Sequence, residues 1–198
     1  MTSPRTIATV TGWLFLITYI TSIPAQLALY VPMLKDPLFI LGSGPDAGIS
    51  LGVFLEIILV VANVGTAVVL YPLIKRQNET VALGYVAARV VESMAIMVGI
   101  FSVLSMLALR QGVVAGAEAE VLVPIGQTLV ALHDASFLLG PGFLAGLGNG
   151  ILLGYLMFRS GLVPRAMAML GLVGGPLLIL AMIGIVFGVF AAGSQWQI

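Results

Sequence analysis

Long apolar stretches alternate with short polar segments along the whole chain, and this pattern predicts its elements. Each apolar stretch is long enough to cross about 30 Å of hydrocarbon as a helix that rises about 1.5 Å per residue. The segments between them carry most of the charged residues, with several prolines and glycines. The pattern predicts an all-α integral membrane protein, a bundle of about five helices forming one transmembrane domain over residues 1–198. The predicted spans cover residues 7–30, 49–74, 81–109, 122–158 and 166–191.

The composition argues against a soluble protein. Hydrophobic residues make up 60% of the chain and charged residues 8%, whereas soluble domains have about 45–50% and about 25%. The formal net charge is zero, so we expect the lipid bilayer rather than nucleic acid as a partner. A cleaved signal peptide is the competing interpretation of the first span, but its apolar run is longer than the roughly 7–15 residues of such a segment.

The chain has no cysteine and a single histidine. This excludes disulfides and a cysteine nucleophile, and also a histidine-rich zinc site within one chain. We therefore expect no metal and no cofactor. Residues 48–52 match the G-x-S-x-G pattern of a serine nucleophile, but that pattern works at a strand-to-helix turn, which no stretch here provides. An enzyme is the less favoured interpretation.

The fourth stretch, residues 122–158, allows two topologies. As one helix its 37 residues would extend about 55 Å, more than one crossing needs. It forms either one span with an extension or two spans hinged at Gly140-Pro141. The positive-inside rule favours one span, a fourth helix broken near Gly140-Pro141, and a cytoplasmic N-terminus in the inner (plasma) membrane. A single crossing places five basic residues on the N-terminal side against two on the other: Arg5, Lys75, Arg76, Arg159 and Arg165 against Lys35 and Arg110.

Polar residues inside the spans predict a polar core at two levels of the membrane. Heights follow from counting about 1.5 Å per residue from the N-terminal side. Arg89 and Glu92 are three residues apart, so they share a helix face and are expected to pair, since unpaired charges are costly there. The level near the bilayer midplane contains Asn63, Arg89, Glu92 and Asn149, and the level nearer the opposite surface contains Glu56, His133 and Asp134.

Two interpretations of this core remain open. In the first, the core binds or translocates a small molecule or a proton, and a water-accessible cavity joins the two levels. In the second, the protein is a non-catalytic accessory or interaction subunit, and a sealed ion network only fixes how the helices pack.

Glycines at every fourth position of the fourth stretch predict a helix-packing face. Such a ridge is flat and lets another helix approach closely. Two pairs of glycines on the last span repeat the spacing, at residues 171 and 175 and at residues 184 and 188. We therefore expect the fourth and fifth spans to pack together, with a homodimer contact as the alternative. The ridge consists of Gly142, Gly146, Gly150 and Gly154.

Two blocks of the sequence carry a family resemblance. One extends from residues 68–72 to residues 89–92, and the other from His133-Asp134 through Gly140-Pro141, Asn149 and Tyr155 to residues 159–165. Together they resemble a bacterial family of small membrane proteins called "domain of unknown function 4386". The resemblance implies a polytopic inner-membrane protein of no established activity. Members usually continue beyond the Trp196 region into a further apolar helix, so the resemblance also implies a truncated chain that lacks a sixth span. The residues that match the family pattern include Glu56, Arg89, Glu92, His133 and Asp134.

Overall fold

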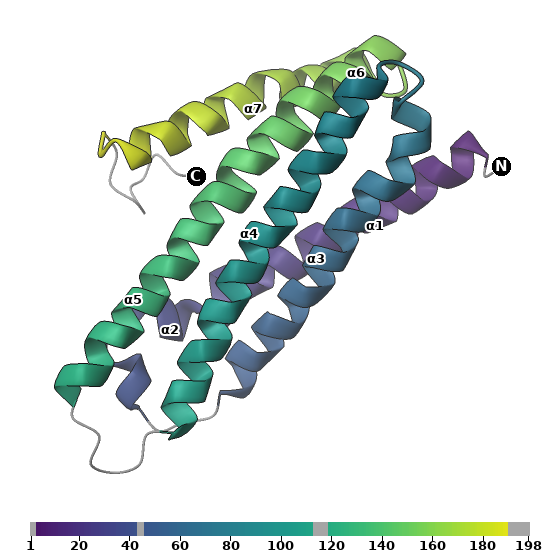
Figure 1. The fold of residues 1–198 in the computed structure, drawn as a ribbon. Coiled ribbons are helices and arrows are strands. Elements are labelled where there is room, and N and C mark those ends of the chain that lie inside the picture. The colour runs from purple at the N-terminus through teal and green to yellow at the C-terminus, as the bar shows by residue number, and fades with distance from the viewer. Residues whose placement is uncertain (1–2, 43–45, 113–118, 190–198) are drawn as a thin grey trace.

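The computed structural model describes residues 3–42, 46–112 and 119–189, which form helices and no strands (Figure 1). This confirms the predicted all-α membrane fold. Within the described residues, five helical stretches are long and apolar enough to cross a membrane. The predicted end of the last span at residue 191 and the Trp196 region lie outside the described residues. The five stretches are Pro4–Leu29, Ala47–Ile74, Glu79–Gly112, Val121–Ser160 and Arg165–Val186.

The first span begins as α1 (Pro4–Pro24) and continues as the π-helical η1 (Ala25–Leu29). Ser3 caps α1, because its hydroxyl accepts a hydrogen bond from the Thr6 amide at 3.2 Å. Proline occupies the first turn of α1, where its missing N–H costs nothing. These local signals explain why the helix begins at residue 4.

The segment after the first span differs from the prediction. The sequence predicts a loop over residues 32–46, but the structure forms α2 (Val31–Lys35) and the short 3₁₀ helix η2 (Phe39–Leu41) there. Met33 and Ile40 are each only 1% exposed. These apolar side chains pack into a core cluster with residues of α3 and α4, and this burial holds the segment against the end of the bundle.

The second and third spans, α3 (Ala47–Ile74) and α4 (Glu79–Gly112), form an antiparallel helical hairpin. α1 packs against α3, and α4 packs against the fourth span. Two apolar clusters fill the interior, one near α2 and η2 and the other near the turn between α3 and α4. Asn63 on α3 and Arg89 on α4 lie between these clusters.

The fourth span is one continuous stack of α5 (Ala119–Phe137), η3 (Leu138–Leu144), η4 (Gly146–Leu153) and α6 (Gly154–Ser160). The predicted interruption at Gly140-Pro141 takes the form of π-helical winding in η3 and η4, not of two separate helices. Pro141 lacks the N–H of a regular helical turn, and π-helical bonds reach one residue further along the chain, so the helix continues through the proline. The stretch is thus one continuous helix that is long and apolar enough to cross a membrane, and its single crossing stays a prediction.

The last helix, α7 (Arg165–Val186), follows a tight turn and packs against η4 and α6. Gly161 ends α6 with a φ of 65°, a left-handed conformation that glycine adopts without strain. In Figure 1 the N-terminus, the α3–α4 turn and the α6–α7 turn lie at one end of the molecule. That end therefore carries the five basic residues that a single crossing places together.

Candidate functional site

The first polar group, here called the arginine cluster, consists of Asn63 and Thr66 on α3 and Arg89, Glu92 and Ser93 on α4. Arg89 Nη1 donates to Glu92 Oε2 at 2.7 Å, and both side chains are almost fully buried. Arg89 Nη2 donates to the Asn63 side-chain oxygen and to Thr66 Oγ1. Asn63 Nδ2 in turn donates to Ser93 Oγ at 3.1 Å. The guanidinium thus joins the two helices of the hairpin through charged and polar partners.

The second polar group, here called the glutamate cluster, consists of Gln26 and Tyr30 after α1, Glu56 on α3 and His133 on α5. Gln26 Nε2 donates to Glu56 Oε1 at 2.8 Å, and the Tyr30 hydroxyl donates to Glu56 Oε2 at 2.9 Å. His133 Nε2 lies 3.4 Å from Gln26 Nε2, and its ring meets the Tyr30 ring edge-on. Three spans therefore meet around one buried carboxyl group.

His133 and Asp134 are adjacent in sequence but do not share one environment. The His133 side chain is 3% exposed and the Asp134 side chain 65%. His133 Nδ1 lies 3.5 Å from Asp134 Oδ1, so the aspartate touches the cluster only from outside. Consecutive residues of a helix point about 100° apart, so Asp134 lies outside the buried cluster but beside His133 in the wall of the outer pocket, and its part in binding stays a prediction.

A cavity of about 180 Å³, here called the chamber, connects the two clusters. Glu56 contributes to its wall from the glutamate cluster, and Asn63, Arg89 and Glu92 contribute from the arginine cluster. At about 30 Å³ per molecule, this volume corresponds to roughly six waters or one small solute. Glu56 from the predicted outer level thus faces the same space as the predicted midplane residues.

The electrostatics of the chamber are asymmetric. The Arg89 charge is paired with Glu92. Among the described residues, no lysine or arginine forms an ion pair with Glu56, whose hydrogen-bond donors are the amide of Gln26 and the phenol of Tyr30. One guanidinium therefore faces two carboxyl groups, and the chamber favours a positively charged occupant or a proton.

Two larger pockets adjoin the chamber along the same side of the fourth span. The apolar pocket, with Thr11, Phe15, Asn149, Met157 and Met167 in its wall, encloses about 590 Å³ and shares Phe15 and Asn149 with the chamber. The outer pocket, with Gln26, His133, Pro141 and Met182 in its wall, encloses about 690 Å³ and shares Pro141 with the chamber. Three neighbouring spaces therefore lie along the fourth span, the chamber and the apolar pocket facing α1 and the outer pocket facing η1 and α7.

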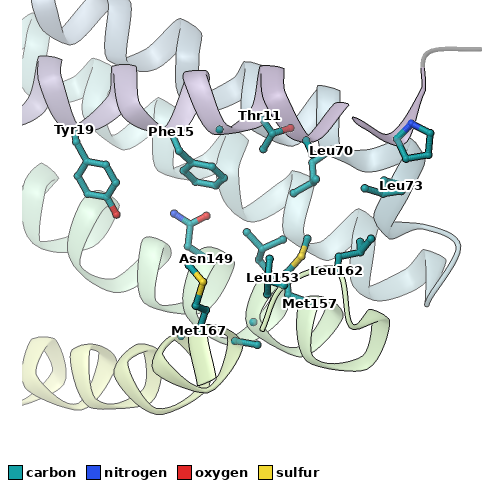
Figure 2. Close-up of a pocket in the computed structure, with 17 residues that line it drawn as sticks. Thr11, Phe15, Tyr19, Leu70, Leu73, Asn149, Leu153, Met157, Leu162 and Met167 are labelled. Atoms are coloured by element: carbon teal, nitrogen blue, oxygen red, sulfur yellow. The ribbon is translucent and has the colours of Figure 1, made fainter. Parts of the chain in front are cut away.

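Asn149 lies on η4, away from the arginine cluster with which the sequence groups it. The structure shows no hydrogen bond between Asn149 and a described residue of that cluster, and Asn149 Oδ1 is buried without a partner. Its amide extends toward α1 across the apolar pocket (Figure 2). Asn149 therefore stands at the boundary between the chamber and the apolar pocket.

The glycines of the fourth span lie against α7. An added Cβ at Gly175 would fall 2.6 Å from the Gly146 carbonyl oxygen and 2.8 Å from the Gly150 Cα. The two backbones thus approach as closely as side-chain-free residues allow. Because α7 occupies the ridge, a second copy of the chain cannot use the same glycines, and pairing of copies through another face stays a prediction.

Sequence reasoning overlooked Tyr30 and Thr11. Tyr30 is fully buried and donates to Glu56, and Gly52 on the facing turn of α3 leaves the space for its ring. The available signal was the spacing of four residues between Gln26 and Tyr30, which places both on one helix face. Among the described residues, no group of three or more histidine and acidic residues is arranged to hold a metal ion.

The fold and these buried clusters define a polytopic α-helical membrane protein with a charged interior. The profile of the family described as "Domain of unknown function (DUF4386)" matches residues 10–197. The chain belongs to this family, as its sequence blocks indicate. No curated protein and no solved structure matches the chain.

Proposed function

We propose that the protein binds a small, positively charged molecule or a proton in the chamber and translocates it through this polar core toward the outer pocket. The observation that carries this proposal is the chamber itself, which places Glu56 and the Arg89–Glu92 pair on one cavity. We further propose that the protein resides in the inner (plasma) membrane with its N-terminus in the cytoplasm, since the five basic residues at one end agree with the positive-inside rule.

Glu56 is the residue expected to hold the charge of the occupant. It is 3% exposed and receives its hydrogen bonds from uncharged groups. An ionised carboxylate without a cationic partner is expensive to keep in a membrane interior. A bound cation or proton would remove that cost, and the neighbouring outer pocket, with Gln26 and His133 in its wall, would give it a way in or out.

The alternative is an accessory subunit whose ion network is purely structural. The bonding of Arg89 favours it, because Glu92, Asn63 and Thr66 together satisfy both terminal nitrogens of the guanidinium. The two proposals differ in one property: a functional chamber admits small polar solutes, and a structural network excludes them.

Thiol labelling tests this difference, because the chain contains no cysteine and gives no background. Ser22 lines the chamber, so Ser22→Cys would place one thiol in its wall. The purified variant in detergent is treated with methanethiosulfonates that carry an ammonium or a sulfonate group. Each labelling rate is divided by the rate of the same reagent with a free thiol in solution. Val61→Cys, on the outside of α3 and 67% exposed, serves as the control for a thiol facing the lipid.

We expect the cationic reagent to label Ser22→Cys at least about tenfold faster than the anionic one, because an ionised Glu56 attracts the first reagent and repels the second, and a difference of only about 1.4 kcal/mol between them gives this ratio. Glu56→Gln in the Ser22→Cys background should remove most of this preference. Labelling of Ser22→Cys no faster than that of Val61→Cys, by either reagent, would refute the proposal and favour the accessory subunit. Equal rates for the two reagents would refute the cationic class of ligand.

A further inference from the structure

The apolar pocket has the properties of a binding site separate from the chamber. Its volume of about 590 Å³ lies within the range of about 300–1,000 Å³ typical of small-molecule sites. α1 forms one wall, and η4, α6 and α7 form the opposite one (Figure 2). None of the described residues that line it carries a charge. A charged occupant would lose its hydration there without compensation, so the pocket suits an uncharged molecule.

Two buried polar atoms in this pocket lack partners. Thr11 Oγ1 and Asn149 Oδ1 form no hydrogen bond to any described residue, although Thr11 is only 6% exposed. Figure 2 shows the Asn149 amide pointing from η4 toward α1, and the Tyr19 hydroxyl pointing into the same space. An unpaired polar atom is costly where no bulk water is present. An occupant that bonds to these atoms would remove that cost.

The pocket also opens to the outside of the bundle. Gly12 and Tyr19 lie in its wall and are exposed. An added Cβ at Gly12 would meet no atom within 4 Å, so the space beside α1 is free. A molecule dissolved in the bilayer can therefore enter sideways, without passing the charged chamber.

We propose that this pocket binds an uncharged lipophilic molecule that carries a hydroxyl group. The Asn149 amide both donates and accepts, and so does the Thr11 hydroxyl, so a ligand hydroxyl, which also does both, can pair with either side chain, whereas a carbonyl can only accept. The apolar part of the molecule packs against Phe15, Met157 and Met167. This site does not depend on the charge of the chamber and stands apart from the proposed translocation.

Photolabelling of the full chain in phosphatidylcholine nanodiscs tests the site. The probe is a long-chain alcohol with a diazirine in its chain, and its matched control is the same hydrocarbon without the hydroxyl. Adducts are located by mass spectrometry. We expect the alcohol probe to label the peptides that contain Met157 and Met167. Excess alcohol without the diazirine should compete with the probe and suppress this labelling. Asn149→Leu should weaken this competition about three- to tenfold, the range for losing one hydrogen bond between uncharged groups. Dioleoylglycerol serves as a second competitor. Competition by dioleoylglycerol indicates that the site takes a hydroxyl-bearing membrane lipid, and competition by the long-chain alcohol alone indicates a single-chain alcohol.

Two glycine-to-leucine substitutions, one inside the pocket and one outside it, distinguish a loss of binding from misfolding. Gly12→Leu fills the pocket from α1 and should abolish saturable labelling. Gly174→Leu makes the same change on the exposed side of α7, where an added Cβ also meets no atom within 4 Å, and should leave labelling unchanged. Glu56→Gln should also leave it unchanged, which separates this site from the chamber. Equal, unsaturable labelling by both probes, or equal labelling of Gly12→Leu and Gly174→Leu, would overturn the proposal.

Discussion

Replacing Gly150 by alanine should loosen the crossing of η4 and α7. An ideal Cβ there would fall against the Gly175 Cα, 3.1 Å from the Gly175 nitrogen and 3.2 Å from the Gly171 carbonyl oxygen. Ordinary van der Waals contact begins at 3.4 Å. All three atoms belong to the backbone, so no side-chain rotation relieves the overlap and the helices have to separate. Overpacking of this kind costs about 1–3 kcal/mol of unfolding free energy.

Gly174→Ala is the matched control, because an added Cβ at Gly174 meets nothing within 4 Å. Both substitutions gain the helix propensity of alanine over glycine, up to about 1 kcal/mol, so their difference isolates the overpacking. Gly142→Ala should be milder than Gly150→Ala, since its Cβ would meet the flexible end of Met182. Unfolding by increasing fractions of SDS in mixed micelles, followed by tryptophan fluorescence, measures these free energies. A Gly150→Ala variant within about 0.5 kcal/mol of Gly174→Ala would refute the close approach.

The buried polar clusters give two further predictions for the same titration. Glu92→Met should destabilise the protein by about 3–5 kcal/mol, because it leaves the Arg89 guanidinium buried without a carboxylate, whereas the double variant with Arg89→Met should recover most of this loss. An equal loss in the single and double variants would contradict the pairing. Tyr30→Phe removes the 2.9 Å bond to Glu56 and should cost about 1.5–3 kcal/mol if the carboxyl is ionised. A loss below about 0.5 kcal/mol would mean that this bond does not hold an ionised carboxylate.

The spans were predictable because hydrocarbon permits almost no other structure. A backbone without water must satisfy its own hydrogen bonds, so a long apolar run in this chain becomes a helix. Arg89 and Glu92 were also predictable as a pair, since three residues of helix separate them and an isolated charge is costly. These predictions rest on distances within one helix.

Features that depend on several helices were not predictable in the same way. Residues 32–46 look like a loop by composition, but Met33 and Ile40 are drawn into the core by contacts with distant segments. An aromatic residue at the end of an apolar run, such as Tyr30, is typical of the membrane interface, so its spacing of four residues from Gln26 was the one sign in the sequence that it faces the interior. Pro141 signals an interruption of the helix, but it does not tell whether the chain bends or widens its turns.

The π-helical winding of the fourth span affects the direction of its glycine ridge. In a regular α-helix, residues four apart are offset by about 40°, so the three intervals from Gly142 to Gly154 would add up to about 120°. The ends of such a ridge would point to different sides of the helix. A π-helical turn holds more residues, so each residue advances the helix by a smaller angle and this angular drift shrinks. Gly142 and Gly154 are the two ends of the ridge. An added Cβ at Gly142 would meet Met182, and an added Cβ at Gly154 would meet Leu172, so both ends still face α7. The straight seam between the fourth and fifth spans thus depends on the pitch of η3 and η4 as well as on the glycines.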